Sequence, residues 1–122
     1  MKIDEQIRKA IGAHSMWKTR LQQNIDGKLA LDPAEVCVDD RCEFGRWLHG
    51  LGSGPVASDP SYVRVVELHK AFHQAAGSVV RDAKAGDKAA ATASIDSGAY
   101  ATASAQLTRA MMQWRDQAAK AA

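Results

Sequence analysis

Hydrophobic residues recur every three or four positions along most of this chain, a spacing typical of amphipathic helices. The first such stretch runs from about Asp4 to Asp26, and Gly27 follows it as a stop signal. His14 lies on the apolar stripe of this helix, so we expect its side chain to point into the fold and not into water. The stripe also contains Ile3, Ile7, Ile11 (or Ala10), Trp17, Leu21 and Ile25.

A loop over residues 27–40 and a short helix come next. Within the loop, Asp32 followed by proline can start a single helical turn, because aspartate caps a helix and proline suits its first position. The short helix is predicted over residues 41–49, with Asp39 or Asp40 as its cap. Cys42 would then be its second or third residue, where the helix dipole favours an anion and lowers the pKa of a thiol.

Two longer helices complete the pattern. One begins at Asp59 followed by proline and ends at Gly86; Asp87 caps the other, which extends to about residue 118. Gly98 lies inside this last helix, where glycine costs about 1 kcal/mol relative to alanine. We therefore expect a local irregularity near Gly98.

These elements predict an all-α fold. The favoured architecture is an antiparallel four-helix bundle with one additional short helix that carries Cys42. A three-helix bundle with an appended helix is the nearby alternative. The length of 122 residues suits a single domain over residues 1–122.

Charge and hydropathy narrow the function classes. Sixteen basic and fourteen acidic residues give a net charge of +2, which offers no electrostatic reason to expect nucleic acid or an anionic membrane as a partner. No apolar run approaches the roughly 20 residues of a membrane span, and the polar first ten residues lack the apolar segment of a secretory signal. We expect a cytoplasmic protein with Cys37 and Cys42 as thiols or thiolates.

The histidines carry the candidate chemistry. His69 and His73 are four residues apart on a helix, so both imidazoles lie on one face and can chelate one metal ion. That spacing alone is a weak signal. His14 needs a polar partner on its apolar stripe, and Cys42 offers a thiolate, so the four residues together favour a metal site. Three nitrogens and one sulfur suit tetrahedral Zn²⁺.

Three segments of the chain resemble the signature blocks of the chemoreceptor zinc-binding (CZB) domain family. The family pattern has an A-x-x-x-H-x-x-W-type block, a C-x-F-G-x-W-L block and a closing H-x-x-F-H, in this order. The corresponding segments here are AIGAHSMWK over residues 10–18, CEFGRWL over residues 42–48 and HKAFH over residues 69–73. The resemblance extends over nearly the whole chain.

The resemblance implies a zinc-binding, usually homodimeric four-helix bundle with His14, Cys42, His69 and His73 as the Zn²⁺ ligands. It also implies a regulatory role, because such domains accompany bacterial chemoreceptors and diguanylate cyclase output modules. There they respond to zinc, or to oxidants such as hypochlorous acid through the ligand cysteine. One departure is His49, where tyrosine is common in the family; His49 could compete as a ligand.

Three other functions fit the sequence less well. A zinc hydrolase with an incomplete three-His site lacks an H-E-x-x-H motif, and four protein ligands leave no open position for catalysis, so we expect no enzyme and no catalytic residues. A di-iron bundle of the hemerythrin type needs more histidines than four and bridging carboxylates. A helical interaction module without metal leaves the inward histidines unexplained.

Several neighbours of the candidate ligands have more than one interpretation. Gly45 is expected to let the short helix approach its neighbours closely. Cys37 is either a small loop residue or a resolving thiol for an oxidised Cys42. A group of aromatic residues is expected to pack around the site and exclude water: Trp17, Phe44, Trp47 and Phe72.

Overall fold

Aspartates start three of the helices in the computed structural model, which describes residues 2–121. Each accepts a hydrogen bond through its side chain from a backbone N–H of the first helical turn, which would otherwise lack a partner. The distances are 3.0 Å for Asp32 to the Ala34 N–H, 2.9 Å for Asp59 to the Ser61 N–H and 3.0 Å for Asp87 to the Ala90 N–H. These capping predictions are confirmed.

The described part of the chain is helical and contains no strand, so the all-α class is confirmed. Two short 3₁₀ turns, Leu51–Ser53 and Pro55–Ser58, connect α4 to α5. The α-helices are α1 (Ile3–Ser15), α2 (Trp17–Ile25), α3 (Pro33–Val36), α4 (Glu43–Gly50), α5 (Pro60–Lys84), α6 (Lys88–Asp96) and α7 (Ala99–Ala121).

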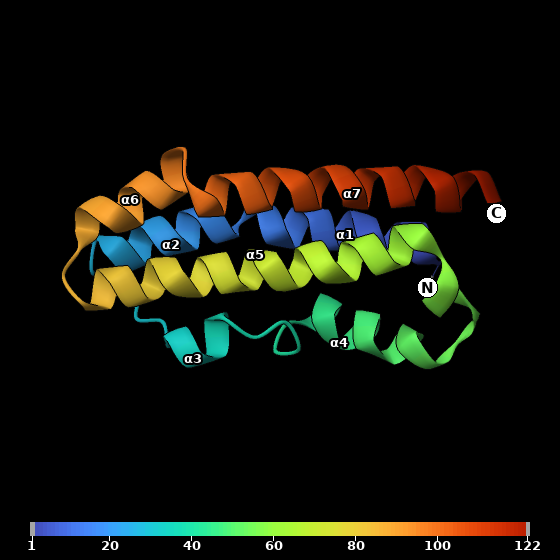
Figure 1. The fold of residues 1–122 in the computed structure, drawn as a ribbon, viewed down its shortest axis with the longest axis horizontal. Coiled ribbons are helices and arrows are strands. Elements are labelled where there is room, and N and C mark those ends of the chain that lie inside the picture. The colour runs from blue at the N-terminus through green and yellow to red at the C-terminus, as the bar shows by residue number, and fades with distance from the viewer. Residues whose placement is uncertain (1, 122) are drawn as a thin grey trace.

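Successive lengths of the chain run in alternating directions along the long axis of the molecule (Figure 1). The α1 and α2 helices run one way, α3 and α4 return, α5 repeats the direction of α1, and α6 and α7 return again. The α5 helix packs against α7, α6, α3 and α2, and α1 packs against α7. Three long helical rods are formed by α1 with α2, by α5, and by α6 with α7. The short helices α3 and α4 cover one side of these rods.

Two of the rods are interrupted. The first stretch, predicted as continuous, breaks at Met16 between α1 and α2, and no glycine or proline marks this break in the sequence. The irregularity expected at Gly98 is confirmed, because α6 ends at Asp96 and α7 begins at Ala99. A Cβ at Gly98 would lie 2.9 Å from the Cα of Ser94, so only glycine fits this tight connection.

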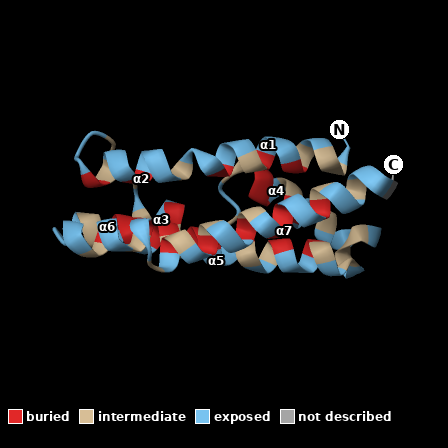
Figure 2. Ribbon diagram, turned by 90° about the horizontal axis from the view of Figure 1, so that it is seen from above, coloured by how far each residue is buried: buried red, intermediate tan, exposed pale blue. Residues whose placement is uncertain are grey.

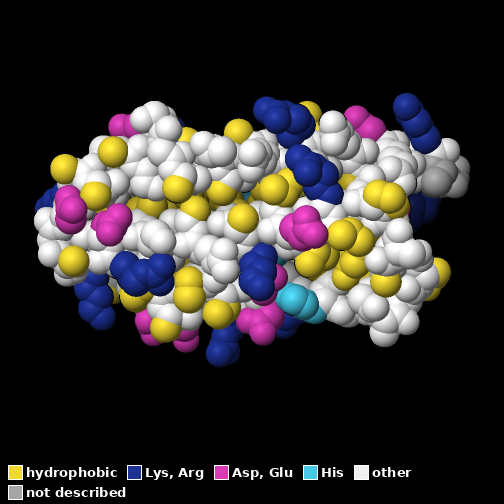
Figure 3. Space-filling model, viewed as in Figure 1, with side chains coloured by type: hydrophobic (Ala, Val, Ile, Leu, Met, Phe, Trp, Pro, Cys, Tyr) yellow, Lys and Arg dark blue, Asp and Glu magenta, His cyan; other side chains and the backbone are white. Residues whose placement is uncertain are grey.

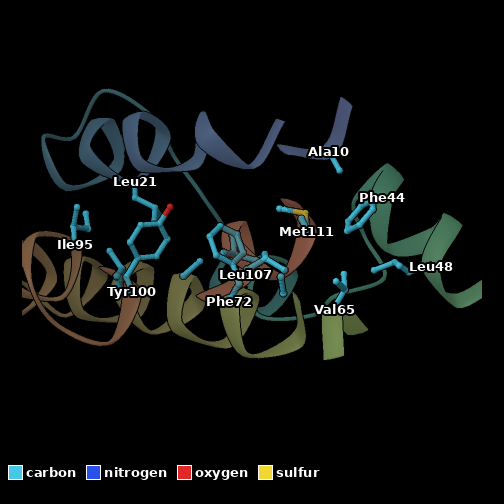
Figure 4. Close-up of a cluster of buried hydrophobic side chains, with 14 of the residues drawn as sticks. Ala10, Leu21, Phe44, Leu48, Val65, Phe72, Ile95, Tyr100, Leu107 and Met111 are labelled. Carbon is cyan, nitrogen blue, oxygen red and sulfur yellow. The ribbon is translucent and has the colours of Figure 1, made fainter. Parts of the chain in front are cut away.

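The core fills the space between the rods. Buried residues form a stripe on the inner side of each long helix, and exposed residues lie on the outer side (Figure 2). Phe72 and Tyr100 meet with ring centroids 5.4 Å apart, and Leu107 and Met111 of α7 complete the same layer (Figure 4). Phe44 and Leu48 of the short α4 helix point toward this core, so α4 is anchored by its buried side chains. Within the described residues, the helices fall short of the length and apolar character that a membrane crossing requires.

Candidate metal centre

His14 reaches the core from the last turn of α1. Its side chain is 5% exposed, and Nδ1 lies 2.8 Å from the carbonyl oxygen of Ala10, one turn earlier. A ring N–H at Nδ1 donates to this carbonyl and fixes the ring orientation. Nε2 then carries the lone pair and points toward α5.

His69 and His73 face His14 from the middle of α5. Their Nε2 atoms are 3.1 Å apart, as the i, i+4 spacing predicts. His73 is oriented by α3, because its Nδ1 lies 3.1 Å from the carbonyl oxygen of Val36. His69 is fully buried, and its Nδ1 has no hydrogen-bond partner among the described residues.

Cys42 approaches the imidazoles from the N-terminus of α4. Its Sγ lies 3.5 Å from Nε2 of His69 and 3.7 Å from Nε2 of His73, and it accepts a hydrogen bond from the N–H of Gly45 at 3.2 Å. Two predictions about this residue are wrong. The cap of α4 is Cys42 itself, not Asp39 or Asp40, so Cys42 precedes the helix.

The second correction concerns the Cys42 thiol. Its pKa is raised, not lowered, because the cost of burial exceeds the stabilisation of the thiolate by the N–H groups of the first turn and by Arg46. The helix terminus therefore supplies hydrogen bonds to the sulfur without making it a free thiolate. A cation beside the sulfur would reverse this balance.

Gly45 makes the approach of α4 possible. A Cβ at this position would collide with the carbonyl oxygen of Asp39 and would lie 3.2 Å from Cε1 of His69. The prediction that Gly45 permits a close approach is confirmed.

The four side chains meet at one point. One donor atom from each of His14, Cys42, His69 and His73 lies within 4.8 Å of all the others. These donors come from three elements, α1, α5 and the start of α4, and α7 contributes none of them.

The spacing of the donor atoms suits a tetrahedral zinc ion. Bonds of about 2.05 Å to nitrogen and about 2.3 Å to sulfur place tetrahedral donors about 3.3 Å (N···N) and about 3.6 Å (N···S) apart. The observed distances are 3.1 Å for His14 Nε2 to His69 Nε2 and for His73 Nε2 to His69 Nε2, and 3.5 and 3.7 Å for the two sulfur contacts. The donor set and its spacing therefore fit Zn²⁺.

Burial keeps the imidazoles neutral. It lowers the pKa of His14 to about 4 and that of His69 to about 2, and it lowers the pKa of His73 as well. A proton on Nε2 of His69 can be donated to Nε2 of either His14 or His73, but not to both. Nitrogen lone pairs without a donor therefore remain at the centre of the cluster. A divalent cation at the centre satisfies all of these lone pairs together.

Aromatic rings surround the imidazoles at edge-to-face angles. Phe44 lies 5.6 Å from His14 and 5.3 Å from His69, and Phe72 and Trp17 contact the cluster from α5 and α2. Trp47 was expected in this shell but packs one layer further out, between Phe44 and Trp114. The face shown in Figure 3 shows histidine colour only in one small area, in keeping with the burial of the cluster.

The two remaining candidate residues lie outside the cluster. His49 is half exposed and its Nε2 lies 3.3 Å from a carboxylate oxygen of Asp39. Cys37 ends α3, and its Sγ donates a weak hydrogen bond to the Ala34 carbonyl oxygen at 3.6 Å. No sequence pattern pointed to Gly77, whose missing Cβ makes room for Cys37, or to the Val36 carbonyl that orients His73.

Comparison with known families decides what kind of protein this is. The family model of the chemoreceptor zinc-binding domain matches residues 14–80, more than half of the chain. This chain belongs to the chemoreceptor zinc-binding domain family. The matched segment begins at His14 and contains Cys42, His69 and His73, and Zn²⁺ is the cofactor that the family and this donor set support. Searches of curated proteins and of solved structures gave no significant match.

Proposed function

We propose that His14, Cys42, His69 and His73 bind one Zn²⁺ and that this CZB domain is a sensory or regulatory module. The convergence of three neutral imidazoles and one thiol within 4.8 Å is the observation that carries the proposal. Four protein ligands fill the tetrahedral shell of zinc, whereas catalytic zinc sites keep one position for water or substrate. The donor count therefore favours a regulatory role over an enzyme.

The zinc–thiolate supplies the sensing chemistry. Zinc holds a ligand cysteine as the thiolate, which is the form that oxidants such as hypochlorous acid attack. Oxidation of Cys42 to the sulfenic acid would weaken its bond to the metal and release the N-terminus of α4. Zinc availability can act on the same contact, because metal affinity is coupled to the folding of the segments that carry the ligands.

The structural unit proposed for this function is the whole chain, residues 1–122, as one domain. The family match ends at residue 80, but α6 and α7 pack against α5, and α7 also packs against α1. The four alternating lengths of chain support a four-helix bundle in which the second length is split into α3 and α4 (Figure 1). We propose a cytoplasmic homodimer that signals to a chemoreceptor or diguanylate cyclase output module, of which the dimer and the output are what the resemblance implies.

Zinc content tests the ligand assignment. We expect one zinc ion per chain in the purified protein by elemental analysis, and a lower zinc content together with a lower melting temperature in Cys42→Ala and His73→Ala. The chain offers a matched control for each, because Cys37→Ala and His49→Ala alter the same residue types outside the cluster. Equal zinc content in all four variants would refute the assignment.

The same assay tests sensing. Zinc should be released when the protein is treated with stoichiometric hypochlorous acid, and the oligomeric state or shape should change in parallel by light scattering. Zinc that is retained after the Cys42 sulfur has been oxidised would argue against a redox sensor.

A further inference from the structure

The four donor groups differ in how far solvent can reach them. His14, His69 and His73 are each at least 95% buried, whereas Cys42 is only partly buried. A reagent that enters from solvent therefore meets the sulfur before it meets the imidazoles. The approach to Cys42 then decides what the centre can react with.

A cavity of about 300 Å³ borders both Cys42 and His73. It lies between α2, the loop that precedes α3, α3 itself and the segment that leads to α4. Trp17 forms one wall with the guanidinium group of Arg20 stacked 4.1 Å from its ring centroid, and Leu31 and Val36 contribute apolar surface. Ala30 is exposed and also lines this cavity.

We propose that this cavity is the entrance through which small thiol-directed electrophiles reach Sγ of Cys42. Its volume is at the lower end of the range of about 300–1,000 Å³ for small-molecule sites, so it admits molecules of a few heavy atoms and excludes bulky ones. The consequence for signalling rests on the proposed function, because modification of Cys42 matters only if Cys42 holds the metal. The access route itself does not depend on that assignment.

A second groove on the molecule would provide an alternative route from solvent to the metal centre. A groove of about 720 Å³ between the α1–α2 segment and α7 borders His14, and Ala105 is an exposed residue of its lining. Entry from this side would meet an imidazole that is 95% buried before it reached the sulfur. The two routes can be blocked separately by the same substitution, alanine to tryptophan.

Iodoacetamide is the probe, applied to the zinc-loaded chain in a Cys37→Ser background so that Cys42 is the one cysteine left in the sequence. In the reaction, Sγ of Cys42 forms a bond to the methylene carbon while the carbon–iodine bond breaks and iodide leaves with the electron pair. Intact-protein mass spectrometry gives the alkylation rate, and a chromophoric chelator gives the rate of zinc release.

We expect Ala30→Trp to slow the alkylation of Cys42 several-fold and Ala105→Trp to leave the rate unchanged. The bulky N-(1-pyrenyl)iodoacetamide, which carries the same reactive group, should react far more slowly than iodoacetamide with the parent protein. If Ala105→Trp slows the reaction and Ala30→Trp does not, or if the bulky reagent reacts as readily as the small one, the proposed entrance is wrong. Leu31→Trp, in the same cavity, replaces Ala30→Trp if that variant fails to fold with normal zinc content.

Failure of this inference and failure of the zinc-ligand assignment give different results. A Cys42→Ser variant that keeps its zinc overturns the assignment but leaves the effect of Ala30→Trp on alkylation intact. A normal loss of zinc in Cys42→Ser combined with no effect of Ala30→Trp overturns only the entrance.

Discussion

Hydrogen bonds with the backbone orient individual side chains at the metal centre. The carbonyl groups of Ala10 and Val36 hold two imidazoles with Nε2 directed inward, and the N–H of Gly45 holds the Cys42 sulfur. Hydrogen bonds of this kind around a metal ligand fix its orientation and tune its basicity. These backbone contacts direct the donor atoms of His14, His73 and Cys42 toward their common centre.

Substitution of Gly45 tests this arrangement at the scale of one atom. We expect Gly45→Ala to lower the zinc affinity and to destabilise the fold by about 1–3 kcal/mol, because the added methyl group collides with the Asp39 carbonyl and presses on the His69 ring. Competition with a zinc chelator and chemical denaturation measure the two effects.

Gly50→Ala is the matched control in the same helix. A Cβ at Gly50 meets no atom within 4 Å, and its φ of −62° suits any residue. We expect this variant to keep its zinc affinity and its stability. If Gly45→Ala behaved like Gly50→Ala, the close packing of α4 against α5 would be irrelevant to the centre.

The sequence allowed the donor residues to be predicted but not their local surroundings. His69 and His73 follow from helical periodicity, His14 from its apolar stripe and Cys42 from its place near the start of a short helix, and the resemblance to a known family implied all four as ligands. The cap of α4 was missed because aspartate is a far commoner cap than cysteine, and Asp39 and Asp40 lie three and two residues before Cys42. The raised pKa of Cys42 depends on burial by distant segments, which the local sequence does not reveal.

The α4 helix takes part both in the metal centre and in the packing of the rest of the fold. Its N-terminus carries Cys42, Phe44 packs on the imidazoles, and Trp47 packs on Trp114 of α7 with ring centroids 5.9 Å apart. A change at Cys42 therefore acts on an element that also contacts α7.

Tyr62 of α5 contacts α4 at the end of this helix that is distant from Cys42. Its buried hydroxyl donates a hydrogen bond of 2.7 Å to the Leu48 carbonyl oxygen. We expect Tyr62→Phe to lower the free energy of unfolding by about 1 kcal/mol, because a buried hydrogen bond is lost while the ring remains. Denaturant titration of the zinc-loaded protein measures the change.

Zinc stoichiometry should remain normal in Tyr62→Phe, since this contact positions the far end of α4 and not the sulfur. A loss of zinc in this variant would show that the whole of α4, and not its first turn alone, is needed to hold Cys42 in place.

The element boundaries show where sequence patterns are informative. Asp32, Asp59 and Asp87 marked helix starts correctly, and Gly98 marked the irregularity between α6 and α7, because each reflects a local backbone requirement. The break at Met16 has no such local cause and was not predicted. The packing of α4 depends on contacts between residues distant in the chain, such as that of the Tyr62 hydroxyl with the Leu48 carbonyl 14 residues earlier, which periodicity alone cannot pair.

At the scale of the whole molecule, the centre joins segments that are distant in sequence. His14 and His69 are 55 residues apart and Cys42 and His73 are 31 residues apart, yet all four meet inside one helical core. A metal ion bound there connects α1, α4 and α5 directly. Loss of one ligand would therefore alter how α4 is held against the long rods.

X-ray absorption spectroscopy of the zinc-loaded protein at the zinc K-edge tests the central claim most directly. We predict a four-coordinate ion with one sulfur at about 2.3 Å and three imidazole nitrogens at about 2.0–2.1 Å, and a loss of the sulfur shell in Cys42→Ala. A spectrum of the unmodified protein without a sulfur neighbour, or with an oxygen in place of one of the three imidazoles, would contradict the account.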